Sequence, residues 1–267
     1  MKRKTLYNPY LIIVFLFITQ LNFSNTVLVF VDYTRNLDYF VDGNKYKLKN
    51  DLKDLIKEYN LNSLDRLILV EIKKYNKDKI RGKIIVIGEG KEFKKRFRSK
   101  EKLKEFLNQN TTNKVDFLLL SHSVSSERLD AFLSFSGSKY DLILASACKM
   151  ASIEKLKVMS KYSSFAIASP VNIHLAHLDI SGLSNNLKGT TLEKGKRILD
   201  KSFSRLLKFT RSNLVLNLYK LDAQLLNKDI CVTNNFDKLI LHQKIKLSLF
   251  EKKKKSINLF KILDCED

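Results

Sequence analysis

Short apolar runs rich in Val, Ile and Leu alternate with amphipathic runs along the chain, and this alternation constrains the fold more than any other feature. A continuous apolar run bounded by polar residues is typical of a strand buried on both faces of a sheet. We therefore expect strands at residues 26–31, 67–72, 83–87, 115–120, 141–145 and 165–168. Residues 213–219 fit either a strand or the start of a helix.

Between these runs, leucines and aromatic residues recur at the spacing of one face of an α-helix. The pattern predicts helices near 48–59, 103–107, 129–133, 150–162 and 199–206, the second of them capped by Ser99. Strands that alternate with helices indicate βαβ units and an α/β fold with a mainly parallel central sheet. Hydrophobic residues make up 44% of the 267 residues, and no low-complexity linker separates a second domain, so residues 25–267 are expected to form one domain.

The N-terminus has the pattern of a secretory signal peptide. Lys2, Arg3 and Lys4 precede an apolar run at 11–18, which is shorter than the roughly 20 apolar residues of a membrane-spanning helix. We expect residues 1–24 to be removed on export. This predicts a secreted, periplasmic or cell-envelope protein whose mature form has no transmembrane span. An uncleaved anchor and a buried N-terminal strand are the alternatives.

Cysteines in an exported chain meet an oxidising compartment, and this chain has three of them. A disulfide between Cys231 and Cys265 is one arrangement, and it leaves Cys148 as a thiol. The sequence does not decide whether these two cysteines meet in space.

Two histidines, His174 and His177, are spaced so that one helical turn would present both to a metal ion, with Asp179 as a third ligand. The stretch lies between Pro170 and Gly182, which favours a loop. We therefore expect a surface pair and no metal site.

The charge is strongly positive, because 49 Lys and Arg outnumber 28 Asp and Glu, a formal net charge of +21. A cluster at 95–104, beside Phe93 and Phe97, would suit nucleic acid, and contact with an anionic cell envelope is a second interpretation. Lys dominates over Arg, and the cations are spread over the whole chain. A solvated surface is therefore favoured, and nucleic acid is not expected as the main partner.

Two reactive side chains follow two of the expected strands. His122 comes just after the strand at 115–120, and Cys148 comes just after the strand at 141–145. If these strands are neighbours, the thiol lies within reach of a base at the carboxyl edge of the sheet, which is the arrangement of nucleophilic catalysis.

Cys148 is expected to precede the helix at 150–162 directly, and the helix N-terminus and Lys149 then favour a thiolate. The backbone N–H groups of Ser123 and Cys148 are candidate oxyanion donors. The alternative is that Cys148 is a small buried apolar residue.

The residues around these positions resemble a known family. Ser-Ala-Cys148-Lys-Met-Ala-Ser-Ile-Glu is similar to the Asp-Ala-Cys-Leu-Met-Ala-Ser-x-Glu signature of the clostripain-like cysteine peptidases, and Phe-Leu-Leu-Leu-Ser-His122-Ser is similar to their strand that ends in His-Gly. Thr-Val-Leu-Val-Phe-Val-Asp32 resembles their opening strand. The order agrees over about 26–185, and the C-terminal part is divergent or shortened.

This resemblance implies a caspase-like αβα sandwich and a Cys–His dyad. Cys148 is then the nucleophile and His122 the acid and base, and peptide bonds are hydrolysed through an acyl-enzyme. Protein or peptide is the implied substrate. The chemistry requires no cofactor, and a calcium site is suggested by the resemblance alone.

Two departures from the family pattern concern specificity and catalysis. The family has an Asp in the substrate pocket where this chain has Ser146, which puts a preference for Arg or Lys before the scissile bond in doubt. Asp179 is a candidate for the far wall of the pocket. Ser123 replaces a Gly, which would strain a left-handed backbone there. The prediction is an exported cysteine endopeptidase, and the alternative is an inactive caspase-like homologue that binds a peptide or an envelope polymer.

Overall fold

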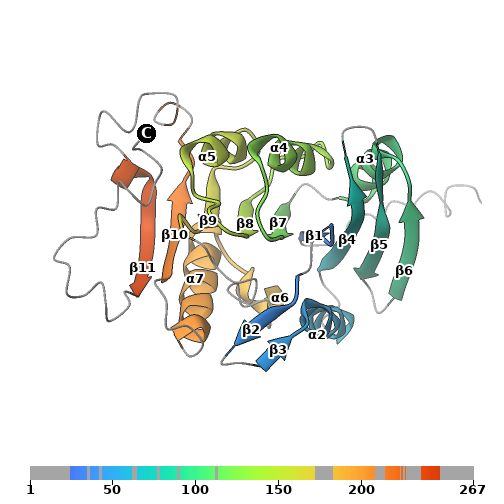
Figure 1. Cartoon of the computed structure of the whole chain (residues 1–267), viewed down its shortest axis with the longest axis horizontal. Helices are drawn as coiled ribbons and strands as arrows, with labels where there is room; N and C mark the ends of the chain where they lie inside the picture. The colour runs from blue at the N-terminus through green and yellow to red at the C-terminus, as the bar shows by residue number, and fades with distance from the viewer. Residues whose placement is uncertain are drawn as a thin grey trace, which may run out of the picture.

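The computed structural model (Figure 1) describes residues 25–34, 37–41, 44–61, 65–76, 79–88, 91–111, 114–171, 183–207, 214–222, 224, 226 and 236–246. A nine-stranded sheet has the order β11-β10-β9-β8-β7-β1-β4-β5-β6, and β2 and β3 form a separate hairpin. The bounds of the strands are β1 Thr26–Asp32, β2 Tyr39–Val41, β3 Asn44–Tyr46, β4 Arg66–Tyr75, β5 Ile80–Gly88, β6 Lys91–Phe97, β7 Val115–Leu120, β8 Leu142–Ser146, β9 Phe165–Ala168, β10 Leu214–Lys220 and β11 Ile240–Lys246.

The centre of the sheet is parallel, as the sequence predicts. Strands β4, β1, β7, β8 and β9 pair in parallel, and antiparallel strands extend the sheet on both sides. All six expected strands are present, and the ambiguous run at 213–219 is the strand β10. The sequence does not predict β6, because its residues 91–96 are all exposed and carry no apolar stripe.

Helices cover both faces of the sheet, which confirms the α/β sandwich. They are α2 Leu48–Leu61, α3 Lys100–Asn110, α4 Ser126–Ser134, α5 Ile153–Ser160, α6 Leu183–Asn186 and α7 Thr191–Leu207, and a 3₁₀ helix, η2, spans Phe236–Leu239. Figure 1 shows α3, α4 and α5 on one face and α2, α6 and α7 on the other. Successive residues of a strand point to opposite faces, so Leu28 and Phe30 pack in one apolar cluster while Val27 and Val29 pack in the other.

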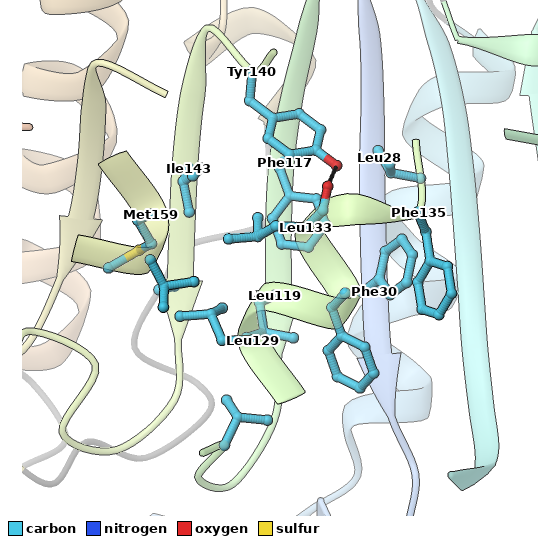
Figure 2. Packing of buried hydrophobic residues seen from close by; sticks show 14 of the residues in the cluster. Leu28, Phe30, Phe117, Leu119, Leu129, Leu133, Phe135, Tyr140, Ile143 and Met159 are labelled. Atoms are coloured by element: carbon cyan, nitrogen blue, oxygen red, sulfur yellow. Dashed lines mark hydrogen bonds between the residues drawn. The ribbon is translucent and has the colours of Figure 1, made fainter. Parts of the chain in front are cut away.

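Aromatic rings fill the core under α4. Phe30 from β1 and Phe117 from β7 lie with ring centroids 5.3 Å apart, and Phe30 stacks on Phe135 at 6.1 Å. Figure 2 shows these rings between the strands and the helix, with the Tyr140 hydroxyl donating a hydrogen bond to the Leu133 carbonyl oxygen at 2.8 Å. Burial of such large apolar side chains fixes β1 and β7 as neighbours beneath α4.

The ends of two helices test the expected boundaries. Ser99 caps α3, and its hydroxyl accepts a hydrogen bond from the Lys102 backbone N–H at 3.2 Å, as predicted. The helix expected at 150–162 begins only at Ile153, so that prediction is wrong at its start. Backbone N–H groups of this stretch donate instead to the segment after β9, from Lys149 to the Val171 carbonyl and from Ala151 to the Ser169 carbonyl.

Several predictions lie outside the described residues. They concern the signal peptide at 1–24, the His174–His177 pair with Asp179, and Cys231 with Cys265. Within the described segments, every helix is too short or too polar to cross a bilayer.

Candidate active site

His122 and Cys148 lie beside each other at the carboxyl edge of the sheet. Strands β7 and β8 are neighbours, with Leu120 paired to Ser146, and each reactive residue follows its strand by two positions. The Cys148 backbone N–H donates to the His122 carbonyl oxygen at 2.7 Å, and the Ser121 N–H donates to the Ser146 carbonyl at 3.2 Å. The strand order therefore brings together the imidazole-bearing and thiol-bearing segments that the sequence separates.

Both side chains are accessible. His122 is exposed and Cys148 is half-buried, while Ala147 and Met150 on either side of the thiol are buried in the core. Lys149, the residue after Cys148, has φ +50°, a left-handed conformation that costs a non-glycine residue roughly 1 kcal/mol. The Lys155 ammonium donates to the Lys149 carbonyl at 2.8 Å. The turn that carries Cys148 is therefore stabilised by the burial of Ala147 and Met150 and by hydrogen bonds to the backbone of Lys149.

The helix N-terminus that was expected to stabilise the Cys148 thiolate does not lie directly after Cys148. Helix α5 starts five residues after Cys148 (153 − 148 = 5), so the thiol does not directly precede the helix. The Cys148 N–H is already bonded to the His122 carbonyl, and in this conformation it is engaged within the protein. An oxyanion role for that group requires this bond to break.

Of the two residues proposed from sequence for the substrate pocket, the structure describes only Ser146. Ser146 is fully buried as the last residue of β8, so its side chain lines no open surface here. Asp179 lies outside the described residues. Among the described His, Cys, Asp and Glu side chains, no group of three or more gathers to hold a metal ion.

A buried carboxylate near Ser121, the residue before His122, is the feature that sequence reasoning missed. Asp32 ends β1, is 3% exposed, and accepts hydrogen bonds from the Arg128 guanidinium at 2.8 Å and the Thr34 hydroxyl at 2.7 Å. The Ser121 hydroxyl, one residue before His122, lies 3.4 Å from the other Asp32 oxygen. The Arg128 guanidinium also covers the Tyr75 ring at 4.7 Å. The only sequence signal for this carboxylate was the position of Asp32 at the end of a buried strand. Its ion-pair partner, Arg128, lies 96 residues further along the chain.

Replacing Arg128 by leucine is expected to lower the free energy of unfolding by about 2–4 kcal/mol, because the Asp32 carboxylate stays buried without its cation. Urea unfolding of the full chain measures the change. The matched control is Lys161→Ala, which breaks an ion pair with Asp130 whose side chains are 59% and 39% exposed and should cost less than about 1 kcal/mol. Equal losses in the two variants would show that the Asp32 pair does not hold this edge.

Comparison with known proteins finds likeness in structure. No protein-family model and no curated protein matches the chain. A secreted C11 cysteine protease from Bacteroides thetaiotaomicron, solved with an irreversible peptide inhibitor, aligns over 84% of this chain and 85% of its own, with 12% identity and a TM-score of 0.60. A structure of the secreted C11 cysteine protease iotapain from the same organism covers 75% of this chain and 67% of its own at 13% identity, with a TM-score of 0.53.

An inactive zymogen C11 protease from Parabacteroides distasonis aligns over 78% of this chain and 64% of its own, at 12% identity and a TM-score of 0.50. At these identities the likeness concerns the fold. The chain has the caspase-like α/β architecture of the C11, or clostripain-like, cysteine proteases.

Proposed function

We propose that this protein is a cysteine endopeptidase that hydrolyses peptide bonds with the Cys148 thiol and the His122 imidazole. The observation that carries the proposal is the position of both residues just beyond the paired ends of β7 and β8, with their backbones joined by a hydrogen bond of 2.7 Å. A thiol and a base at one accessible edge are the elements of covalent catalysis. The fold shared with C11 proteases supports the same reaction class.

The proposed reaction has two steps. His122 takes the thiol proton, Cys148 Sγ attacks the substrate carbonyl carbon, and the C–N bond breaks as the protonated His122 gives its proton to the leaving amine. Water then loses a proton to His122 and attacks the thioester, which releases the carboxylic acid and restores the thiol. The Ser123 N–H is the proposed donor to the oxyanion, joined by the Cys148 N–H once its bond to the His122 carbonyl opens.

We further propose that the enzyme is exported and acts on peptides or proteins outside the cytoplasm. The basic, then apolar N-terminal sequence supports export, and the B. thetaiotaomicron proteases of this fold are described as secreted. Contact with an anionic envelope stays an open proposal. A calcium site is proposed from the resemblance to the clostripain-like peptidases, and a Cys231–Cys265 disulfide would leave Cys148 as the thiol.

The proposal is tested with a peptide carrying a thiol-reactive warhead. The full chain is incubated at pH 6, where only activated thiols react quickly, and digestion with mass spectrometry locates the label. Cys148 should be labelled far faster than Cys231 or Cys265, and His122→Ala should slow it. Labelling of all three cysteines at similar rates would overturn the assignment of the nucleophile.

A second candidate is a catalytically silent peptide-binding homologue. The bond that engages the Cys148 N–H favours it, since an active site needs oxyanion donors. It predicts labelling of Cys148 without turnover of any peptide.

Ser146 stands where the resembling family has an Asp, so this position brings no carboxylate to the residue before the scissile bond. A carboxylate at this position would pair with guanidinium, but a buried serine hydroxyl carries no charge. We therefore expect the full chain to cleave a peptide library with basic and neutral residues at that position at rates within about threefold of each other. A preference for Arg of a hundredfold or so would instead point to another carboxylate, with Asp179 the first to replace by Asn.

A further inference from the structure

A groove with a strongly cationic lining lies on the β4–β5–β6 part of the sheet. Its volume is about 1000 Å³, and nine Lys and Arg residues line it against a single acid, Glu71. This groove, here named the basic groove, includes Lys49, Lys73, Lys74, Arg81, Lys83 and Arg96. Nine of the 49 Lys and Arg residues of the chain therefore gather at one concave surface.

The strand register puts these cations on one face. Lys83 on β5 pairs with Glu71 on β4 and with Arg96 on β6. These side chains lie on the same face of the sheet as Ile85, which is the face that α2 covers. Not every lining cation points into the groove: the Lys95 ammonium lies over Phe106 at 5.4 Å. Lys94 is paired with Glu92 at 2.6 Å.

Like charges stand directly opposite each other in this groove. Lys83 faces Arg96, and Lys74 faces Arg81, and like charges at opposed positions destabilise a sheet. Lysines on the edge strand β6 are explained by protection against edge-to-edge pairing, but Lys73, Lys74 and Arg81 lie off that edge. Within the described residues, the ion pairs formed by carboxylates do not include Lys73, Lys74, Arg81, Lys83 or Arg96. An anionic ligand would relieve this repulsion.

The basic groove adjoins a second cavity that extends toward the carboxyl end of β1. This cavity of about 460 Å³ shares Lys73, Lys74 and Arg81 with the groove and extends to Thr34. The Thr34 hydroxyl donates to Asp32, which the hydroxyl of Ser121 also contacts. In Figure 1 the order from β7 through β1 to β4, β5 and β6 can be followed across the sheet. Neighbouring strands lie about 4.8 Å apart, so β4 to β6 are roughly 10–19 Å from β7, or about three to six residues of an extended peptide.

Aromatic side chains do not form a stacking surface in the groove. Phe97 lines it but is 3% exposed, and the exposed Phe93 lies on the opposite face, stacked on Phe106 at 6.4 Å. Single-stranded nucleic acids are held by stacking on aromatic rings in addition to charge. We propose that the basic groove binds an acidic segment of the protein substrate, several residues from the scissile bond. The inference rests on the proposed function, since it names the class of substrate for that site.

The test separates binding from cleavage. Fluorescence anisotropy on the full chain carrying Cys148→Ala compares a labelled Glu-rich peptide of about ten residues, a Gln-rich peptide of the same length and an oligodeoxythymidylate of the same length. The groove variant is Lys73→Gln/Lys74→Gln/Arg96→Gln. The control is Lys196→Gln/Lys201→Gln/Lys220→Gln, which removes the same charge from exposed positions on α7 and β10.

We expect the Glu-rich peptide to bind about tenfold more tightly than the Gln-rich one, with the gain lost at high salt and in the groove variant but kept in the control. Equal loss in both variants, or tighter binding of the oligonucleotide, would overturn the inference. In the active chain, an acidic tract three to six residues or so from the cleaved bond should raise kcat/KM about tenfold. Groove-dependent binding without cleavage of any peptide would refute the proposed function and leave the groove assignment standing.

Discussion

Replacing Cys148 by alanine is expected to lower kcat/KM for peptide hydrolysis by about a thousandfold or more, because no atom remains to form the thioester. His122→Ala should lose a similar factor, since the thiol then lacks its base. Residues that act as one unit are not additive, so the double variant should be about as slow as either single one. Initial rates on a fluorogenic peptide measure all three.

The matched control replaces the other two cysteines, Cys231→Ala/Cys265→Ala, and should keep most of the activity. Circular dichroism of each variant checks that the chain is folded. If Cys148→Ala retains more than about a tenth of the rate, Cys148 is not the nucleophile. Additive losses in the double variant would show that His122 does not act on that thiol.

Replacing Lys194 by methionine is expected to lower the free energy of unfolding by about 3–5 kcal/mol. Lys194 on α7 is 2% exposed, and its ammonium lies 2.6 and 2.8 Å from the two carboxylate oxygens of Asp116 on β7. Asp116 is 1% exposed, and Asp141 lies farther off at 3.6 Å. The substitution leaves a carboxylate in the interior without its cation.

The loss should grow with pH, and the sign follows from Asp116. Burial raises the pKa of the Asp116 carboxyl to about 6 even with Lys194 beside it, and removal of the cation raises the pKa further. The folded variant then holds a proton that the unfolded chain releases near pH 4, so stability falls as pH rises from about 5 to 8. Urea unfolding at both pH values measures the effect.

Two comparisons make this prediction specific. Lys244→Met breaks an exposed pair with Asp200 at 2.9 Å and should cost less than about 1 kcal/mol. Lys194→Met/Asp116→Asn removes both charges and should regain much of the loss, without the dependence on pH. A loss in Lys194→Met below about 1 kcal/mol at pH 8 would mean that this pair does not hold α7 against the sheet.

The strands were predictable wherever burial leaves a local pattern. The run at 115–120 was predicted with the bounds of β7, since each of its six residues is buried. Strand β6 was not predicted, because an exposed edge strand of lysines has no apolar period. The start of α5 was misplaced because the N–H groups of Lys149 and Ala151 donate to the segment after β9 instead of to their own helix, and no local signal shows that competition.

The candidate site was predictable only in part. Cys148 and His122 were identified because each follows a buried strand, and their meeting depended on β7 and β8 being neighbours, which the structure shows. The role of Asp32 was not visible, since its partners Ser121 and Arg128 are 89 and 96 residues away. The full burial of Ser146 also required the packed sheet.

The sequence by itself determined the alternation of strands and helices and the two reactive residues at strand ends, because side-chain periods of 2 and 3.6 are properties of neighbouring residues. Only the tertiary structure decided which strands lie side by side. The strand order depends on how whole faces of the sheet and the helices pack against one another. It brings together the backbones of Cys148 and His122, which share a hydrogen bond, and the buried Asp32–Arg128 ion pair. It also gathers cations from α2, β4, β5 and β6 into one groove. The +21 charge follows from the composition alone, but the gathering of nine cations in this groove is a product of the fold.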